Sequence, residues 1–305
     1  MRDDRHVPHP LVPPVLDWFG THARDLPWRE PRCTPWGVLV SEVMLQQTPV
    51  VRVRPAWEAW MARWPTPADL AAAPTADVLR AWDRLGYPRR ALRLQQCARH
   101  LVDHHDGVMP TTEDALLALP GVGAYTAAAV MAFAHGRRSV VLDTNVRRVL
   151  ARTLDGVALP HPTLTRPEHA RAEAVVPADD ATAARWSAAV MELGALVCTA
   201  RSPRCDVCPV ADLCRWVADG RPVDAHAHRR RRQGWAGTDR QARGRVMRAL
   251  RTSDHPVPRS VMAADVTDPG QLGRVLDGLV ADGLITPLVV DHAHGEDDPV
   301  YRLPS

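Results

Sequence analysis

Four of the six cysteines fall within one short segment of the chain, as Cys198, Cys205, Cys208 and Cys214. In a chain that we expect to be cytoplasmic, such a cluster argues against a disulfide framework and favours a metal or a reactive thiol. Four thiolates can bind either zinc or a cubane iron–sulfur cluster. Zinc sites usually pair two tight Cys-x2-Cys knuckles, whereas this segment has one. The spacing therefore predicts a metal centre with these four cysteines as its ligands.

Length and composition restrict the class of protein. A chain of 305 residues fits two domains, or one large and one small domain. Hydrophobic residues make up 46% and charged residues 24%, which is typical of a folded globular protein. No apolar stretch is long enough to cross a bilayer, and residues 1–6 are not followed by the apolar core of a secretory signal. We therefore expect a cytoplasmic protein with no membrane partner, in which Cys33 and Cys97 are small buried residues.

The chain contains no lysine, so all 38 Lys+Arg residues are arginines. No side chain can then form a Schiff base, and any mechanism that needs a lysine amine is excluded. The net charge of +3 permits a nucleic-acid partner without requiring one. Two of the arginines, Arg201 and Arg204, lie between the first two clustered cysteines, where they can face a phosphate backbone.

Most of residues 9–216 predicts helix. Apolar residues recur there at spacings of three and four, and prolines and glycines divide these runs into short helices. Alternation of β-branched residues is rare. We therefore predict a mainly α domain over residues 1–218, with helices that include residues 36–47, 56–64 and 91–102.

The last third of the chain has a different organisation. Residues 219–238 form a polar, basic linker with four consecutive arginines at 229–232, which is either a solvated connector or a strap against phosphates. Residues 239–305 predict a small winged-helix-like domain, built from three helices followed by two strands. The helices are expected over 239–252, 259–265 and 269–282, and the strands over 284–290 and 300–303.

Two glycines separate a pair of expected helices in the segment Leu119-Pro120-Gly121-Val122-Gly123. In such a turn the backbone N–H groups open outward, and the start of the next helix adds partial positive charge. A nest of this kind binds a phosphate oxygen without reading a base, so Gly121, Val122 and Gly123 are candidate DNA-binding residues. The turn resembles the helix-hairpin-helix DNA-binding motif. A plain turn between two helices is the alternative.

Two carboxylates stand in contrasting surroundings. Glu42 interrupts an apolar helical stretch, where a carboxyl group is expected to have a raised pKa and to keep its proton, as a general acid requires. Asp143 lies where an apolar run turns into a helix, a favoured N-cap position. The helix end is expected to lower the pKa of Asp143, so that an ionised carboxylate can face developing positive charge on a sugar. The ordinary alternatives are a solvated helix residue for Glu42 and a simple N-cap for Asp143.

Together these features resemble the MutY family of adenine DNA glycosylases, part of the endonuclease III superfamily. The resemblance covers roughly residues 25–216 and rests on Ser-Glu-Val-Met-Leu-Gln-Gln-Thr around Glu42, on Gly-Val-Gly-Ala-Tyr-Thr-Ala around Tyr125, on Asp143 and on the four cysteines. It implies a helix-hairpin-helix DNA glycosylase fold with a [4Fe–4S] cluster on the cysteine loop. Relatives with lyase activity carry lysine where this chain has Tyr125, so the resemblance implies a monofunctional enzyme.

The resemblance also implies a partner and a mechanism. The partner would be double-stranded DNA with an adenine mispaired with guanine or 8-oxoguanine, bound by a monomer that associates with the nucleoid. Glu42 would protonate N7 of the extruded adenine, and Asp143 would stabilise the oxocarbenium-like sugar. Tyr125 and Asn145 would orient Asp143 and the sugar. The DNA contacts implied are those of Arg29, in Leu26-Pro27-Trp28-Arg29, of Gln47 and Thr48, and of Tyr87, in Leu85-Gly86-Tyr87.

The resemblance ends at the C-terminal segment. Many family members carry there a longer, nudix-like domain that reads 8-oxoguanine, and His292 and His294 of this chain have no assigned role. Two alternative functions remain open. One is a related glycosylase that removes thymine or uracil opposite guanine, although N7 protonation by Glu42 suits a purine. The other is a non-catalytic iron–sulfur DNA-binding protein, against which the presence of both Glu42 and Asp143 argues.

Overall fold

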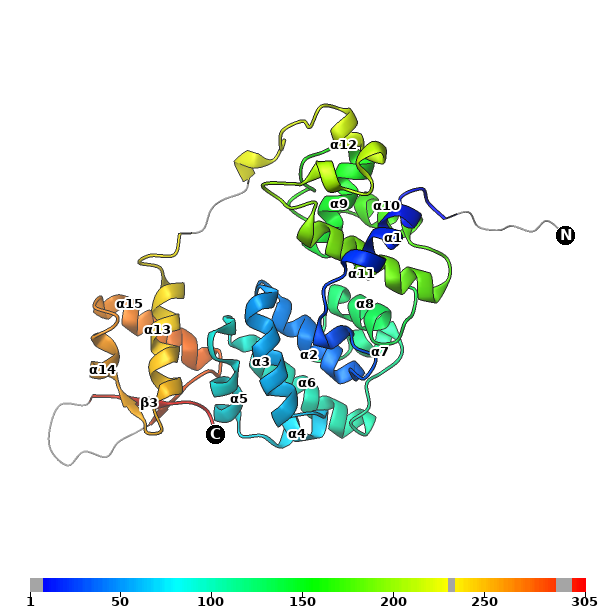
Figure 1. Cartoon of the computed structure of the whole chain (residues 1–305). Helices are drawn as coiled ribbons and strands as arrows, with labels where there is room; N and C mark the ends of the chain where they lie inside the picture. The colour runs from blue at the N-terminus through cyan, green and yellow to red at the C-terminus, as the bar shows by residue number, and fades with distance from the viewer. Residues whose placement is uncertain (1–7, 230–233, 289–297) are drawn as a thin grey trace. The chain divides into compact units, whose positions relative to one another are not determined.

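The computed structural model describes residues 8–229, 234–288 and 298–305. The chain forms two compact units, the first of residues 1–39, 110–118 and 122–231 and the second of residues 40–109, 119–121 and 232–305. Both units are mainly helical, which confirms the predicted fold class (Figure 1). None of the helices in the described ranges is long and apolar enough to cross a membrane.

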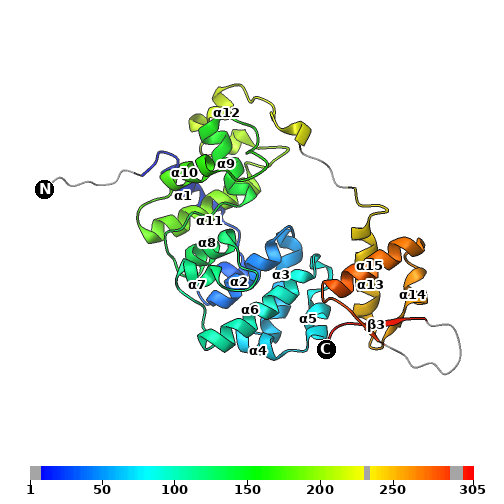
Figure 2. The ribbon, with the colours of Figure 1, turned by 180° about the vertical axis from the view of Figure 1, so that it is seen from behind.

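Helix α11 (Asp180–Leu196) is central to the first unit. It packs against α1 (Val12–His22), α8 (Ala124–Phe133) and α9 (Thr144–Asp155), as Figure 2 shows from behind. The shared core is apolar and includes Trp186, which is 2% exposed. The other helical elements of this unit are η1 (Pro27–Arg29), α7 (Glu113–Leu117), α10 (Arg166–Val175), η3 (Cys205–Val207), η4 (Ala211–Leu213), α12 (Arg215–Ala218) and η5 (Ala227–Arg229).

Helix α6 (Arg89–His105) organises the second unit by packing against α4 (Pro67–Ala72) and α5 (Thr75–Trp82). Tryptophans fill much of this core, since the chain has few other aromatic residues. Trp60 and Trp82 are both buried and meet edge to face, with their ring centroids 5.6 Å apart. The remaining elements near this core are the end of α2 (Pro35–Leu45), α3 (Val50–Arg63) and η2 (Asp83–Leu85).

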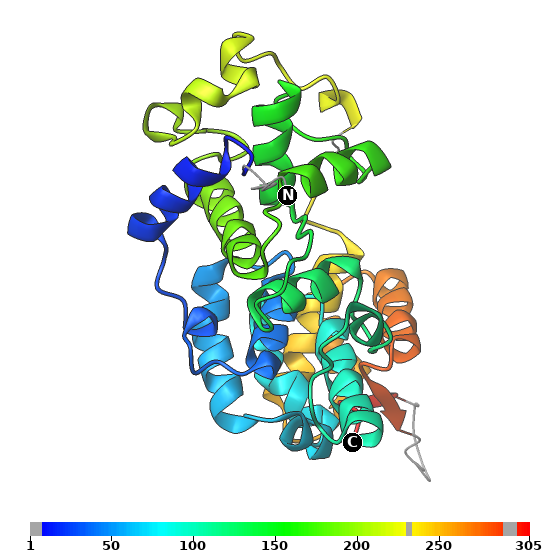
Figure 3. The ribbon, with the colours of Figure 1, turned by 90° about the vertical axis from the view of Figure 1, so that its right-hand side faces the viewer.

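The C-terminal part of the second unit has the order helix, strand, helix, helix, strand, strand (yellow to red in Figure 3). Its three-stranded antiparallel sheet has the order β1-β3-β2, with Tyr301 of β3 opposite Val257 of β1 and Pro287 of β2. This arrangement agrees with the predicted winged-helix-like fold. The elements are α13 (Asp239–Thr252), β1 (Val257–Pro258), α14 (Arg259–Ala263), α15 (Pro269–Ala281), β2 (Thr286–Leu288) and β3 (Val300–Arg302).

Several expected boundaries differ from the observed ones. The helix predicted over 36–47 ends at Leu45, because Gln47 has a left-handed backbone with φ of 55°. Strand β1 was not predicted, since two residues that include a proline at a sheet edge give no alternating pattern. Some predictions lie outside the described residues, namely Arg230–Arg232 of the basic run, the end of the strand expected at 289–290, and His292 and His294.

Candidate functional site

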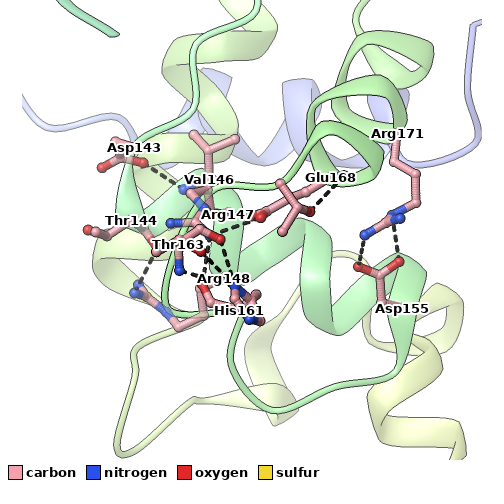
Figure 4. Close-up of polar contacts among 11 residues, drawn as sticks. Asp143, Thr144, Val146, Arg147, Arg148, Asp155, His161, Thr163, Glu168 and Arg171 are labelled. Carbon is pink, nitrogen blue, oxygen red and sulfur yellow. Dashed lines mark hydrogen bonds and ion pairs between the residues drawn. The ribbon is translucent and has the colours of Figure 1, made fainter. Parts of the chain in front are cut away.

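Asp143 caps the start of α9 in the first unit. Its Oδ1 accepts a hydrogen bond from the backbone N–H of Val146 at 2.6 Å (Figure 4). Its Oδ2 accepts one from Nδ2 of Asn145 at 2.8 Å. Burial raises the pKa of Asp143 above its ordinary value, while these two hydrogen bonds and the charge of Arg148 oppose the rise. The expectation that the helix end would lower this pKa is therefore wrong, because desolvation outweighs the capping interactions. The predicted N-cap position itself is confirmed.

Arg148 extends the hydrogen bonds of Asp143 to the first cysteine of the loop. Its Nη2 donates to Oδ1 of Asn145 at 2.8 Å, and its Nε donates to the backbone carbonyl of Cys198 at 2.6 Å. Nη2 of Arg148 also donates to the backbone carbonyl of Gly194, a residue of α11, at 2.7 Å. Because Asn145 donates to Asp143 and accepts from Arg148, both ends of its amide are fixed. These hydrogen bonds therefore form one continuous series from Cys198 through Arg148 and Asn145 to Asp143, which is hereafter called the Asp143 chain.

The close approach of α9 and α11 makes this geometry possible. A Cβ atom at Gly194 would lie 2.7 Å from Cβ of Asn145 and 2.9 Å from its carbonyl oxygen, so only glycine fits. A second arginine braces the outer side of α9, where Arg147 forms two hydrogen bonds with Glu168 of α10 at 2.6 and 2.9 Å (Figure 4). Arg171 also pairs with Asp155 at the end of α9, across a more exposed surface. These contacts hold α9 as a rigid support for its N-terminal carboxylate.

All four clustered cysteines line one pocket that is partly open to solvent. Around it, Arg152 donates from Nη1 to Sγ of Cys198 at 3.2 Å and lies over the ring of Trp216, 4.6 Å from its centroid. Burial, and secondarily the charge of neighbouring thiolates, raises the pKa of Cys208 to about 11. A polynuclear cationic group would offset that cost, since coordination deprotonates thiols.

The residues present fit an iron–sulfur cluster. In the part of the chain that the structure describes, no three His, Cys, Asp or Glu side chains are close enough to share a single metal ion. The cysteines instead surround a space, and four sulfur donors are the ligand set of a [4Fe–4S] cluster. The four cysteines are therefore a candidate ligand set for such a cluster. Arg201 is exposed on the same loop, and Arg204 is exposed while its Nη2 donates to the carbonyl of Leu196 at 2.8 Å.

Glu42 lies on α2 in the second unit and is 5% exposed. The helical residues around it are also buried, with Leu39 and Met44 fully inaccessible to solvent and Val43 8% exposed. The alternative of a solvated helix residue is therefore wrong.

Arg90 fixes the C-terminal end of the helix that carries Glu42. Its Nη1 donates to the carbonyls of Val43, Met44 and Gln46 at 2.7, 3.1 and 2.6 Å. Its Nη2 donates to Oγ1 of Thr48 at 3.1 Å. These carbonyls belong to the last turn of α2 and the residue beyond it, where backbone acceptors have no helical partner. Burial lowers the pKa of Arg90 to about 10, which leaves it charged at neutral pH.

The predicted DNA-contacting residues of the second unit lie on two adjoining turns. Nη2 of Arg90 also donates to the carbonyls of Leu85 and Gly86, at 2.9 and 3.0 Å, and Oγ1 of Thr48 donates to that of Leu85 at 2.9 Å. Gln47 is exposed, Thr48 is buried and Tyr87 is 40% exposed. Both Gln47 and Tyr87 have left-handed backbones, with φ of 55° and 46°. Strained positions of this kind are common where a side chain must be aimed at a ligand.

Arg29 belongs to a cluster of charges in the first unit. Glu192 of α11 is fully inaccessible, and it accepts hydrogen bonds from Nε and Nη2 of Arg24 at 2.7 Å each and from Nη2 of Arg29 at 3.0 Å. Burial alone would raise the pKa of Glu192, but the hydrogen bonds from Arg24 and the charge of Arg29 outweigh it and lower the pKa to about 2. Nη1 of Arg29 is buried and has no hydrogen-bond partner within the described ranges.

The glycine turn connects α7 and α8 as predicted. Gly121 has φ of 81°, and a Cβ atom there would lie 2.9 Å from Cβ of Arg93, so the position requires glycine. Gly123 caps α8 and has open space around its Cα. Val122 is 9% exposed, which leaves its side chain in the core. Tyr125 is half-buried on the first turn of α8 and packs against the alanines of that helix.

Sequence reasoning did not single out Arg90, Arg148 or Glu192. Glu192 interrupts an apolar stretch, between Met191 and Leu193, and this was the signal used for Glu42. Arg90 and Arg148 each follow another arginine and carry no such signal. What the sequence could not show is which backbone carbonyls or partner charges would satisfy them.

Comparison with known proteins gives consistent results. Residues 40–167 match the HhH-GPD superfamily of base excision DNA repair proteins, and residues 198–214 match the iron–sulfur binding domain of endonuclease III. The chain is 52% identical over 272 residues to the adenine DNA glycosylase of Mycolicibacterium smegmatis, covering 89% of this chain and 91% of that protein. Among solved structures it is similar to a thermostable thymine-DNA glycosylase, with 28% identity, a TM-score of 0.62 and coverage of 68% of this chain and 95% of the other. It is also similar to endonuclease III in a non-covalent DNA complex, with 25% identity, a TM-score of 0.58 and coverage of 68% and 92%.

Proposed function

Since this chain belongs to the adenine DNA glycosylase family, we propose that it hydrolyses the N-glycosidic bond of adenine mispaired with guanine or 8-oxoguanine in double-stranded DNA. The observation that carries the proposal is the pair of contrasting carboxylates. Glu42 is buried on an apolar helix, whereas Asp143 is held by hydrogen-bond donors. Such a pair divides the work of bond cleavage between an acid and a stabilising anion.

Glu42 acts as the general acid. Adenine must leave the base stack before a side chain can reach it. Glu42 then donates its proton to N7, and the bond between N9 and C1′ breaks with its electron pair moving to the base. A water oxygen adds to C1′ and a proton is released, which leaves free adenine and an abasic site.

Asp143 stabilises the positive charge that develops on the sugar. The donors Val146 and Asn145 fix both of its oxygens, so its orientation does not change during the reaction. Asn145 acts as a positioning residue because Arg148 holds its amide oxygen. Tyr125, at the start of α8, is assigned to orienting the sugar.

Residues of each unit are assigned their own DNA contacts. Arg29 is assigned to the extruded nucleotide because the segment Leu26-Pro27-Trp28-Arg29 resembles that of the family. Gln47, Thr48 and Tyr87, on their adjoining turns, are assigned to the space that the adenine leaves. Backbone N–H groups at Gly121, Val122 and Gly123 and the side chains of Arg201 and Arg204 are assigned to phosphates.

The four cysteines hold a [4Fe–4S] cluster. When bound, the cluster supplies ligand bonds that fix the loop from residue 198 to 214 and no substrate chemistry. The loop in turn sets the position of the Cys198 carbonyl, on which the Asp143 chain ends.

The proposal extends to reaction type, location and organisation. Without lysine the enzyme is monofunctional, and it works as a cytoplasmic, nucleoid-associated monomer. Its parts are the glycosylase domain of residues 1–218, the basic linker of 219–238 and the winged-helix-like domain of 239–305. A thymine glycosylase activity is less favoured, because the solved thymine-DNA glycosylase is 28% identical and protonation of N7 is specific to purines.

A strand-cleavage assay tests this proposal. Labelled duplexes that contain A:G, A:8-oxoguanine, T:G or U:G would be incubated with the holoenzyme and then treated with alkali. Cleavage at adenine alone is expected, and cleavage at thymine or uracil would favour the alternative. Borohydride should trap no covalent DNA adduct, since a strong trapped band would require an amine nucleophile.

A further inference from the structure

An exposed stack of three flat side chains joins the C-terminal part of the second unit to Tyr87. The guanidinium carbon of Arg240 lies 4.8 Å from the ring centroid of Tyr87 and 5.3 Å from that of Trp235. Trp235 is 54% exposed and Tyr87 is 40% exposed, although both are large aromatic residues. An arginine between two aromatic rings is held by cation–π attraction on both sides.

The placement of Trp235 and Arg240 is built into the fold. Thr238 caps α13, and its Oγ1 donates to the carbonyl of Trp235 at 2.8 Å. Gln271 of α15 donates from Nε2 to the carbonyl of Gly237 and to Oδ1 of Asp239, each at 3.0 Å. The turn that carries Trp235 is therefore fixed to both α13 and α15.

Separate contacts attach the C-terminal elements to the helices beside Tyr87. Asp282 pairs with Arg89, two residues after Tyr87, at 3.2 Å, and also with Arg243 of α13. Arg80 of α5 donates to the carbonyl of Ser253 at 3.3 Å. Since none of these contacts involves the stack, Arg240 and Tyr87 are brought together by the packing of the elements that carry them.

Two further arginines lie beside the turn that leads to Tyr87. Arg84 is largely exposed, and Arg52 donates to its backbone carbonyl at 3.4 Å. Asp83 offsets part of this charge through its 3.6 Å pair with Arg84. Exposed aromatic rings interleaved with arginines are the features by which proteins bind unpaired bases and their phosphates.

We propose that Trp235 and Arg240 form, with Tyr87, a DNA-binding site of the C-terminal part of the chain. The ligand is duplex DNA that contains an unstacked base, on which Trp235 packs while Arg240 contacts a neighbouring phosphate. This inference rests on the proposed function, because extrusion of adenine is what leaves DNA locally unstacked. It gives the winged-helix-like domain a direct part in binding DNA.

Binding of the holoenzyme to a duplex with a tetrahydrofuran abasic site opposite guanine tests the proposal by fluorescence anisotropy. Trp235→Ala and Arg240→Ala should each weaken binding by about tenfold, the loss that removal of one stacking contact produces. Trp235→Phe should retain most of the affinity. Arg240→Ala should also reduce the slope of log Kd against log salt by about one, whereas Trp235→Ala should leave that slope unchanged.

Two variants of the same domain serve as matched controls. Arg248→Ala removes an exposed arginine from α13, and Val261→Ala removes an exposed apolar side chain from α14. Both should bind within about twofold of the wild type, since neither lies in the stack. Equal affinities of the Trp235 and Arg240 variants and these controls would overturn the inference. Failure of the wild type to release adenine from an A:G duplex would instead contradict the proposed function.

Discussion

Asp143 and Glu42 are both largely buried, on different helices of the protein. Asp143 receives hydrogen bonds from Val146 and Asn145, while Glu42 lies on a helix whose neighbouring residues are buried and mostly apolar. Donors stabilise the anionic form of a carboxyl group, and apolar burial stabilises the neutral form. The proposed division of labour requires Asp143 to be ionised and Glu42 to carry a proton, although burial raises the pKa of Asp143.

Replacing Glu42 removes the proposed general acid and should have the largest effect on the rate of adenine release. Glu42→Gln keeps the shape of the side chain but cannot donate a proton to N7, so the single-turnover rate of adenine release should fall by about 10³-fold. Quenched-flow or manual sampling of an A:G duplex measures this rate. Affinity for the abasic duplex should stay close to that of the wild type. Release at the wild-type rate would show that Glu42 is not the acid.

Glu192 provides a third environment, a buried carboxylate matched by two arginines. Its pKa of about 2 lies below the ordinary value, so its stabilising effect is present above about pH 4.5 and is lost as the pH falls towards 2. Glu192→Gln should reduce the free energy of unfolding at pH 7 by about 3 kcal/mol, because it leaves Arg24 and Arg29 without their charge partner.

Thermal melting at pH 7 and at lower pH checks the effect of Glu192. The difference in melting temperature between the wild type and Glu192→Gln should shrink as the pH falls below 4.5. Glu58→Gln, which removes an exposed partner of Arg54, is the control and should change the melting temperature little. A constant difference across this pH range would contradict the assigned ionisation of Glu192.

Breaking the Asp143 chain in its middle should have a smaller effect on the rate. Arg148→Met leaves Asp143 and Asn145 in place but removes the donor that fixes the Asn145 amide, and the rate of adenine release should fall by about 30-fold. Arg147→Met is the matched control, since it removes a buried ion pair on the same helix without touching the chain. The control should lose stability and keep its rate below its melting temperature. Equal rates for the two variants would show that the chain has no part in orienting Asp143.

The sequence predicted the features that depend on local pattern. The helices around the glycine turn, the N-cap position of Asp143 and the three helices and two later strands of the C-terminal segment follow from periodicity, glycine placement and capping preference. The end of α2 could not be predicted, because Arg90, more than forty residues later, stabilises that end. The raised pKa of Asp143 could not be predicted either, because it reflects burial that only the tertiary structure creates.

The pH dependence of adenine release under single-turnover conditions tests the central claim most directly. The account predicts a bell-shaped profile. The rate should fall at low pH as Asp143 is protonated, beginning above the range of an ordinary aspartate because burial raises its pKa, and should fall at high pH as the Glu42 proton is lost. Glu42→Gln should abolish the high-pH fall and leave the low-pH fall in place. A high-pH fall that persists unchanged in Glu42→Gln would contradict the assignment of opposite protonation states to the two carboxylates.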